Sequence, residues 1–309
     1  MKRRRCLSIL AGATAAALSG CGNRRSVEVR KWHGVLFNAE VELAIHDLPT
    51  IEADELIGRC VVEMQRLEQI FSLYLPDSIL CTLNREGRLR NPPPEFVALV
   101  GEALIIADKA EGAFDPTVQP YWQWLRETVE AGRVIDEREQ ARELGKVDYR
   151  KVRCRADEIC YDRAGMAMTL NGIAQGWITD RACDLLRKAG VEHCLVNLGE
   201  FHALGGQPSG QDWLVGIRGA EGREVSLREQ ALAVSSGSGL YFGTGAGKNH
   251  LIHPRTGGCA EDRRIVAVRA ERASTADALS TACAVLGDAE AESLVRKWEG
   301  ASVQIIRPG

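Results

Sequence analysis

Several features are missing from this sequence, and their absence narrows the class of protein. No two of its 10 cysteines have the Cys-x-x-Cys spacing, so a zinc site is not expected. The formal net charge of −3 gives no indication of a nucleic-acid-binding surface. No internal repeat is visible along the chain. The apolar run at residues 7–18 is shorter than the roughly 20 residues that a membrane-spanning helix needs.

Glycines are frequent between residues 235 and 247, but they lack the spacing of a nucleotide-binding loop. A Walker loop requires Gly at position 242 and Ser or Thr after Lys248, where the sequence has Phe242 and Asn249. Phe242 also interrupts the dinucleotide-binding pattern that begins at Gly237. We therefore interpret this segment as a loop over a ligand.

The N-terminal segment has the pattern of a bacterial export signal. Basic residues at Lys2–Arg5 precede an apolar run that ends in small residues, and Leu18–Cys21 resembles a lipoprotein cleavage box. We expect residues 1–20 to be a signal peptide, Cys21 to be the lipidated first residue of the mature chain, and residues 21–31 to be a tether. The folded body would then lie on the periplasmic side of a bacterial membrane, anchored by lipid. An uncleaved membrane anchor is the alternative, and the export route stays open.

Eight cysteines remain when Cys6 and Cys21 are set aside. An even number permits disulfides in an oxidising compartment, and Cys154 and Cys160 could join two adjacent strands. The spacing does not assign the pairs. Several cysteines occupy apolar helix faces, where a buried free thiol is the usual state.

Apolar periodicity predicts an α+β domain with largely antiparallel sheets. The composition, 45% hydrophobic and 26% charged over 309 residues, is ordinary for a soluble globular protein. Spacings of three and four residues predict helices at residues 51–71, 92–112, 121–129, 136–144, 173–189 and 274–285. Alternating or short apolar runs predict strands at residues 35–45, 152–155, 159–162, 194–197, 213–217, 231–235, 265–269 and 302–306, with a hairpin excursion at 219–229. Because strands and helices do not alternate regularly, a doubly wound parallel sheet is not expected.

Two oxygen-bearing residues stand one helical turn apart in the C-terminal part of the chain. Asp277 and Thr281 lie in an apolar-periodic segment, so a helix would direct a carboxylate and a hydroxyl to one face. Mg²⁺ favours such donors and keeps positions open for water or phosphate oxygens. A structural explanation is also open, because an acid favours the first turn of a helix and Thr281 could bond back to a carbonyl.

The segment from His250 to Gly257 contains groups suited to a phosphorylated ligand. Pro254 and Gly257 predict a turn. The segment presents the imidazole of His250, the guanidinium of Arg255 and the hydroxyl of Thr256.

Together with three further segments, these residues resemble the ApbE family of flavin transferases, which move FMN from FAD onto a protein threonine. The family pattern of a His, then Asp-Pro-Arg-Thr-Gly, then Asp-Ala-x-x-Thr in a helix is matched at His250, Pro254–Gly257 and Asp277–Thr281. Further matching blocks, in family order, are residues 71–84, 112–118 and 170–181. The resemblance begins at about Trp32 and implies one ApbE-like domain at residues 32–309, with largely antiparallel sheets flanked by helices.

The resemblance also implies a magnesium site and a flavin site. The backbone carbonyl of Gly172 and the side chains of Asp277 and Thr281 would hold Mg²⁺ against the FAD pyrophosphate. The cation would neutralise charge on the phosphate oxygens while the acceptor hydroxyl attacks phosphorus and AMP leaves. The implied FAD contacts are His33, Ala113, Phe114, Asp115, Gln175, Arg255 and Thr256.

His250 and Asp277 are the expected catalytic residues. Imidazole titrates near neutral pH, so His250 is the candidate base for a threonine hydroxyl, unless turn backbone already satisfies its ring. Asp115 could equally be an Asp-Pro turn residue. Asp180 is expected to support its own helix rather than to touch a ligand.

The sequence departs from the family pattern at four places. The family usually has Asp where Thr169 and His253 stand, and Lys or Glu where Gln175 stands. Its Asn-x-Gly-Gly-Asp stretch is shortened here to Asn197–Glu200. Loss of a carboxylate at Thr169 would weaken Mg²⁺ binding. An imidazole cannot be a carboxylate at any pH, so His253 would replace its counterpart only in part.

Three functions are compatible with these features. The first is Mg²⁺-dependent transfer of FMN from FAD to a Ser or Thr hydroxyl of an exported electron-transfer protein, with release of AMP. The alternatives are an FAD pyrophosphatase that produces FMN and AMP, and an FAD-binding lipoprotein without turnover. The expected partners are therefore FAD, the exported acceptor protein and the membrane, but no nucleic acid.

Overall fold

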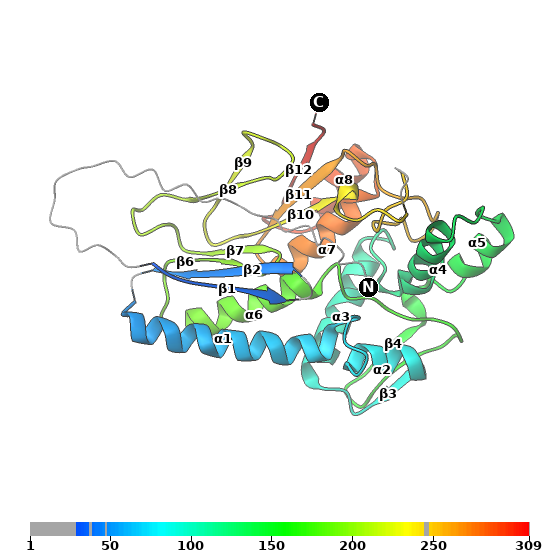
Figure 1. Ribbon diagram of the computed structural model, residues 1–309, viewed down its shortest axis with the longest axis horizontal. Helices are drawn as coiled ribbons and strands as arrows, with labels where there is room; N and C mark the ends of the chain where they lie inside the picture. The colour runs from blue at the N-terminus through cyan, green and yellow to red at the C-terminus, as the bar shows by residue number, and fades with distance from the viewer. Residues whose placement is uncertain (1–28, 37–38, 47, 244–246, 309) are drawn as a thin grey trace.

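The computed structural model describes residues 29–36, 39–46, 48–243 and 247–308 (Figure 1). The predicted signal peptide at residues 1–20 and the predicted lipidation site Cys21 lie outside the described residues. Within the described ranges, no helix has the length and apolar character needed to cross a bilayer.

Eight α-helices lie in the described part of the chain (Figure 1). They are α1 (Thr50–Phe71), α2 (Ile79–Glu86), α3 (Pro94–Lys109), α4 (Gln119–Glu130), α5 (Glu137–Leu144), α6 (Ala174–Lys188), α7 (Ala273–Ala284) and α8 (Asp288–Val295). Six of them occur where apolar spacing predicts a helix. The other two, α2 and α8, were not predicted; each has 8 residues and spans about two turns.

Seven strands form the main sheet in the order β1-β2-β6-β7-β10-β11-β12, and every neighbouring pair is antiparallel. They are β1 (Arg30–Leu36), β2 (Ala39–Ile45), β6 (Cys194–Asn197), β7 (Phe201–Leu204), β10 (Ala231–Ser236), β11 (Ile265–Ala270) and β12 (Ser302–Ile306). Two small antiparallel sheets contain β3 (Arg88–Arg90), β4 (Val152–Cys154) and β5 (Glu158–Tyr161), and β8 (Trp213–Gly216) and β9 (Glu224–Leu227). The predicted α+β architecture with antiparallel sheets is confirmed.

Helices cover one face of the main sheet, and the β8–β9 hairpin covers part of the other (Figure 1). Alternate residues of β10 point to the two faces, as strand geometry requires. Ala231 and Ala233 belong to the core under the helices, whereas Leu232 packs with Trp213 and Leu227 of the hairpin. On the helical side α6 contacts α1, α7 and β7, and α7 contacts β10 and β11. The first turns of α6 and α7 therefore meet beside the sheet.

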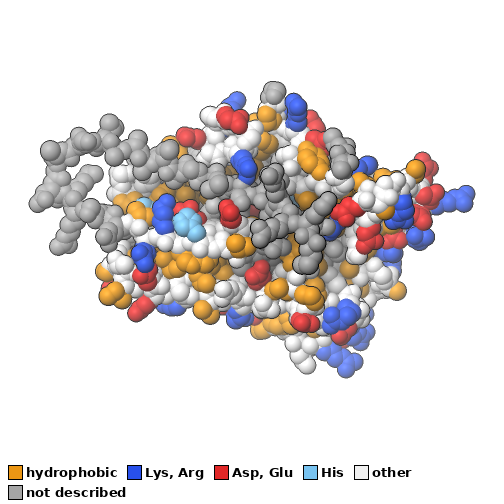
Figure 2. Space-filling view, viewed as in Figure 1, with side chains coloured by type: hydrophobic (Ala, Val, Ile, Leu, Met, Phe, Trp, Pro, Cys, Tyr) orange, Lys and Arg blue, Asp and Glu red, His pale blue; other side chains and the backbone are white. Residues whose placement is uncertain are grey.

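A smaller hydrophobic cluster lies at the α4–α5 end of the molecule. Tyr121 and Leu125 of α4 pack with Phe242 and Ile252, which come from the segment between β10 and β11. Trp122 meets Phe242 edge-on, with 5.1 Å between the ring centroids. Charged side chains of both signs gather on the surface at this end (Figure 2).

The prediction for the N-terminal strand was wrong. Residues 35–36 and 39–45 do not form one strand but belong to the antiparallel strands β1 and β2, whose register pairs Leu36 with Ala39. Apolar alternation runs through both strands, so the pattern alone does not mark the reversal. β1 begins at Arg30, ahead of the domain boundary predicted at Trp32 and inside the predicted tether.

All eight cysteines in the described residues are free thiols. Cys154 lies opposite Ile159, and Cys160 lies opposite Arg153 on the adjacent strand. Because successive residues of a strand point to opposite faces, the two thiols face away from each other. The bridge considered between Cys154 and Cys160 therefore does not form.

Candidate functional site

The first turns of α6 and α7 approach so closely that only glycine fits between them. A Cβ added at Gly176 would lie 2.3 Å from the carbonyl oxygen of Ala273. This approach lets the N–H of Gly176 donate a hydrogen bond of 3.2 Å to Oδ2 of Asp277. The site is therefore built where two helices touch, not within one helix.

Asp180 of α6 caps the N-terminus of α7. Its carboxylate accepts the backbone N–H groups of Ala273 at 2.8 Å and Ser274 at 3.0 Å. It also pairs with His202 at 2.9 Å and Arg272 at 3.3 Å. Burial opposes ionisation of Asp180, but the hydrogen bond from His202 and the charge of Arg272 keep its pKa below the usual value. The prediction that Asp180 supports its own helix was wrong, because these partners lie on β7 and at the start of α7.

The predicted magnesium ligands Gly172, Asp277 and Thr281 lie at the contact between these helices. A Cβ at Gly172 would be 3.0 Å from Oγ1 of Thr281, which places the backbone before α6 beside that hydroxyl. Asp277 is 5% exposed, and burial raises its pKa to about 7. A carboxylate, a hydroxyl and a backbone carbonyl therefore belong to one small region.

The structural explanations for Asp277 and Thr281 do not fit this geometry. α7 begins at Ala273 and has no acid in its first turn, so Asp277 lies beyond the reach of a first-turn dipole effect. The hydroxyl that bonds back to the helix is that of Ser280, which donates to the Asp277 carbonyl at 3.0 Å. Among the described residues, the Thr281 hydroxyl has no hydrogen-bond partner.

The donor set fits a hard cation. All three groups offer oxygen, which Mg²⁺ prefers to nitrogen or sulfur. The described residues contain no cluster of three or more His, Cys, Asp or Glu side chains that could hold a metal. The chain thus offers the cation both backbone and side-chain oxygens and leaves coordination positions open for phosphate.

Glu200 is a buried acid that sequence reasoning did not assign to the site. It is 9% exposed, and burial followed by the charge of Asp277 raises its pKa well above the usual value. Gly199 packs on Gln175, since a Cβ there would lie 2.5 Å from the Gln175 amide nitrogen. The only sequence feature that marked Glu200 was the shortened family stretch Asn197–Glu200. Because this stretch is far from Asp277 in sequence, its proximity to Asp277 could not be predicted.

Ala113 and Phe114 lie in the turn that follows α3. Both side chains are buried. Phe114 reaches the same region as the cation donors, because a Cβ at Gly172 would be 3.5 Å from its ring. The turn thus forms a wall of the site beside Gly172 and Thr281.

Asp115 is held by protein partners in this turn. Its Oδ1 accepts the N–H of Thr117 at 2.8 Å, and its Oδ2 accepts the N–H of Tyr149 at 3.0 Å. Burial raises the pKa of Asp115, and these hydrogen bonds oppose that rise. These contacts support the interpretation of Asp115 as a turn residue. Asp115 also lines a pocket beside this turn.

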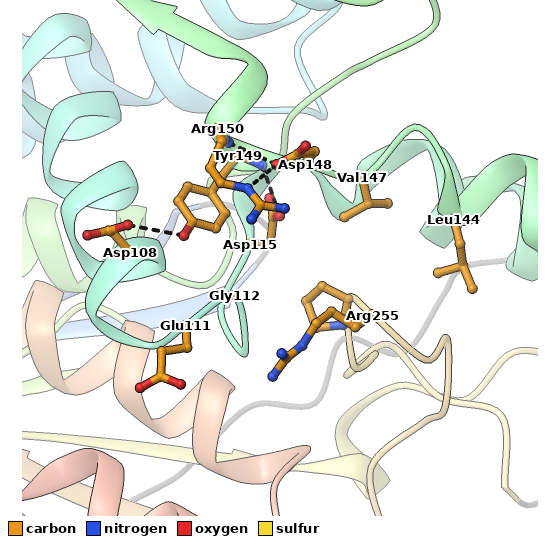
Figure 3. A pocket seen from close by; sticks show the side chains of 11 residues that line it. Asp108, Glu111, Gly112, Asp115, Leu144, Val147, Asp148, Tyr149, Arg150 and Arg255 are labelled. Atoms are coloured by element: carbon orange, nitrogen blue, oxygen red, sulfur yellow. Dashed lines mark hydrogen bonds and ion pairs between the residues drawn. The ribbon is translucent and has the colours of Figure 1, made fainter.

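A pocket of about 500 Å³ lies next to this turn (Figure 3). Its lining comes from the end of α3, from residues 144–150 and from Pro254 and Arg255. Arg150 is paired with Asp148 at 2.8 Å. Arg255 has no ion pair among the described residues, and Figure 3 shows its guanidinium pointing across the opening. The pocket therefore offers a cationic group to an anionic ligand.

The turn that carries Arg255 is closed by His253. The N–H of Gly257 donates to the His253 carbonyl at 2.8 Å, and the N–H of Arg255 donates to Nδ1 of His253 at 3.2 Å. A short acceptor side chain that bonds the N–H two residues on is what an Asp provides in such turns. The neutral imidazole of His253 thus accepts the hydrogen bond that an Asp would accept at this position of the family pattern. The sequence alone did not show that a histidine could do so.

His250 is half-buried and precedes this turn. Its Nδ1 lies 3.3 Å from the carbonyl oxygen of Leu240. Because a carbonyl only accepts, Nδ1 carries the ring proton and Nε2 keeps a lone pair. Burial lowers the pKa of His250, so the ring is neutral at pH 7. Among the described residues, no hydrogen bond joins His250 to Asp277 or Thr281.

Two residues predicted to contact the flavin, His33 and Thr256, lie apart from the cation donors and make local contacts. His33 lies on β1 with its side chain 67% exposed, and its Nδ1 is 3.8 Å from the carboxylate of Glu42 on β2. The hydroxyl of Thr256 accepts the N–H of Gly258 at 3.3 Å. Neither side chain contacts the cation donors within the described residues.

Tyr74 is a further residue that sequence reasoning did not assign to the site. It is 54% exposed, and its hydroxyl accepts a hydrogen bond of 3.2 Å from the Asn171 amide, next to Gly172. The exposed ring of Tyr74 thus lies near Gly172. In the sequence, only its position within the matching block at residues 71–84 pointed to such a role.

The sequence of this chain matches a known protein family and individual members of it. The profile of the ApbE family matches residues 37–305. The chain is 27% identical over 321 residues to the FAD:protein FMN transferase of Treponema pallidum (strain Nichols), covering 94% of this chain and 88% of that protein. It is 28% identical over 276 residues to the FAD:protein FMN transferase of Salmonella typhimurium, covering 82% and 77%.

Solved structures share the fold. The apo form of the flavinyl transferase ApbE of Pseudomonas stutzeri aligns with a TM-score of 0.77 at 23% identity, covering 93% of this chain and 95% of that one. The ApbE protein of Thermotoga maritima aligns with a TM-score of 0.77 at 24% identity, covering 91% and 97%. With its profile match over most of its length, the chain belongs to the ApbE family.

Proposed function

We propose that this protein is an FAD:protein FMN transferase, which moves FMN from FAD to a Ser or Thr hydroxyl of an acceptor protein and releases AMP. Membership of the ApbE family and the activity named for the T. pallidum and S. typhimurium relatives support this function. The observation that carries it is the contact between α6 and α7, which brings the oxygen donors of Gly172, Asp277 and Thr281 together.

These three donors would hold Mg²⁺. The bound cation would neutralise charge on the FAD phosphate oxygens. The N–H of Gly176 engages one oxygen of Asp277 and leaves the other free of that bond. Asp180 fixes the start of α7, so the carboxylate and the Thr281 hydroxyl keep their orientation.

His250 would accept the proton of the acceptor hydroxyl. Its neutral ring, protonated at Nδ1 by the Leu240 contact, presents Nε2 as the base. As the hydroxyl loses its proton to Nε2, its oxygen bonds to the FMN phosphorus. The bond from that phosphorus to the bridging oxygen breaks, and AMP leaves with the electron pair.

Arg255 would bind a phosphate group of the substrate. Its guanidinium forms no salt bridge among the described residues, although its charge acts on Glu111 across the pocket. A charge-assisted hydrogen bond from this guanidinium to phosphate is favourable. The remaining proposed FAD contacts are His33, Ala113, Phe114, Asp115, Gln175 and Thr256.

We also propose that the enzyme is anchored on the periplasmic side of a bacterial membrane and that its acceptor is an exported electron-transfer protein. The support is the basic and apolar pattern of residues 1–20 and the cleavage box at Leu18–Cys21. In cells labelled with a fatty acid, the wild type is expected to incorporate label and Cys21→Ala to incorporate none. Equal labelling of the two would refute the anchor.

The activity is tested by incubating the protein with FAD, Mg²⁺ and a candidate acceptor, and then weighing the acceptor by mass spectrometry. The wild type is expected to add FMN and release AMP. Asp277→Asn is expected to lose AMP release while still binding FAD. Asp212→Asn is the control, because Asp212 is an exposed acid beside β8 that pairs with Arg228.

The other outcomes point to other functions. Free FMN with an unmodified acceptor would favour a pyrophosphatase, in which water replaces the hydroxyl. Bound FAD without AMP release would favour a flavin-binding protein without turnover. Wild-type turnover in Asp277→Asn would contradict the proposed role of the cation site.

A further inference from the structure

Glu200 lies beside Asp277, although the two residues are far apart in sequence. Glu200 stands between β6 and β7, and β7 pairs with β10. The backbone of Val234 on β10 lies close enough to the Glu200 carboxylate to oppose the rise in its pKa. The next residue, Ser235, shares a hydrogen bond of 2.7 Å with Ser280 of α7. These contacts bring the Glu200 carboxylate to the turn of α7 that carries Asp277.

The turn before Glu200 is also held from α6. Gly199 has a φ of 104°, which glycine adopts at little cost, and packs on the Gln175 amide. The N–H of Leu198 donates to the Glu200 carbonyl at 3.1 Å. The turn is thus closed on itself and packed on the first turn of α6, which keeps the Glu200 side chain inside the molecule.

Glu200 and Asp277 are buried acids without a cationic neighbour. They are 9% and 5% exposed. Among the described residues, no salt bridge joins a lysine, arginine or histidine side chain to either carboxyl group, and no such side chain is a leading cause of their pKa shifts. Asp180 differs, because His202 and Arg272 compensate its charge. Two like charges buried together cost free energy unless a cation lies between them.

We propose that Glu200 is a further ligand of the cation site and contributes a second carboxylate beside Asp277. This inference rests on the proposed Mg²⁺ site and deepens it. Glu200 would also replace the carboxylate that the family pattern places at position 169. Thr169 carries no charge, and its hydroxyl accepts a hydrogen bond of 3.2 Å from the N–H of Asn171. Two carboxylates balance the charge of a divalent cation, which favours its binding before FAD arrives.

The test is a calorimetric titration of Mg²⁺ into the FAD-free protein, together with the shift in melting temperature that Mg²⁺ causes. Glu200→Gln keeps the size of the side chain and removes its charge. It is expected to weaken Mg²⁺ affinity about tenfold or more and to reduce the thermal shift. Glu143→Gln is the matched control, because Glu143 is also buried, at 7% exposure, but is paired with Lys146. Wild-type affinity in Glu200→Gln would overturn the inference.

Two further variants separate the possible failures. If Asp277→Asn binds Mg²⁺ like the wild type, the cation site of the proposed function is itself refuted. If Asp277→Asn loses the ion while Glu200→Gln retains it, only the role of Glu200 is refuted. Glu200→Asp keeps the charge but shortens the reach, so an affinity between those of the wild type and Glu200→Gln is expected. Should Glu200→Gln fail to fold, wild-type affinity in Glu200→Asp overturns the inference.

Discussion

The hydroxyl of Tyr121 donates a hydrogen bond of 3.1 Å to the carbonyl oxygen of Gly257. Tyr121 is fully buried in α4, and Gln140 of α5 donates to the same hydroxyl at 3.0 Å. A Cβ at Gly257 would lie 2.3 Å from that hydroxyl. α4 and α5 therefore hold the Pro254–Gly257 turn, and with it Arg255, at the pocket.

Tyr121→Phe is expected to lower the free energy of unfolding by about 1–3 kcal/mol, because buried polar groups lose their partner. It should also raise KM for FAD more than it lowers kcat, since Arg255 loses its support. Urea unfolding and steady-state kinetics measure the two effects. Tyr161→Phe is the control, because the Tyr161 hydroxyl donates to Asn84 at 2.6 Å, and it should change stability without changing KM. The same KM in both variants would contradict this role of Tyr121.

Gly176→Ala and Gly58→Ala should change stability in opposite directions. Helix propensity alone predicts a gain of up to about 1 kcal/mol for each. At Gly58 of α1 an added Cβ meets nothing within 4 Å, so the gain should appear. At Gly176 the Cβ would meet the Ala273 backbone, so α6 and α7 must separate and stability and Mg²⁺ affinity should both fall. Thermal unfolding with and without Mg²⁺ measures this, and a stabilised Gly176→Ala would show that the helices can move apart freely.

Asp180→Ala should be among the most destabilising single changes, at about 3–5 kcal/mol, because it leaves His202 buried without its partner. It also removes the acceptor of the N–H groups of Ala273 and Ser274. Asp180→Asn keeps an acceptor oxygen but loses the charge, so its loss should be smaller. Chemical unfolding of the three proteins gives the order, and equal stability of Asp180→Ala and wild type would rule out the cap as a major contribution.

Acidification should weaken FAD binding through His253. Burial, followed by the charge of Arg255, lowers the pKa of His253 below 6.5, while Glu290 acts in the opposite direction. The neutral ring accepts the Arg255 N–H, so the stability it adds is fully present above pH 6.5 and is lost as the pH falls through the lowered pKa. KM for FAD should rise over that range.

His253→Asp provides the comparison for the pH effect. A carboxylate remains an acceptor well below pH 6, so this variant should keep its KM for FAD to a lower pH than the wild type. KM for FAD measured against pH in both proteins decides the point. Superimposable profiles would mean that protonation of His253 does not affect the turn.

Local pattern was sufficient for much of the fold. Six of the eight helices in the described residues followed from apolar spacing, and Asp277 and Thr281 share a face because four residues make about one helical turn. The β1–β2 reversal was missed because alternation is the same on both sides of it. The helices α2 and α8 were missed. Each has 8 residues, as α5 does, and about two turns of apolar spacing predicted a helix at only one of these three segments.

The roles of Asp180 and Glu200 could not be predicted in the same way. Asp180 has the spacing of an ordinary helix residue, and only the approach of α6 and α7 makes it a cap for another helix. Glu200 reaches Asp277 because β7 pairs with β10, which in turn contacts α7. The spacing of residues along the chain does not predict the order of strands in the sheet.

The sequence by itself determined which oxygen and nitrogen groups are available, which of them share a helix face, and where Pro254 and Gly257 turn the chain. The tertiary structure alone decided that Gly172 lies beside Thr281 and that Gly176 bonds Asp277 across 101 positions of sequence. The physical reason is that helix geometry and turn preferences depend on neighbouring residues, whereas a contact between distant residues depends on how the whole sheet and its helices pack.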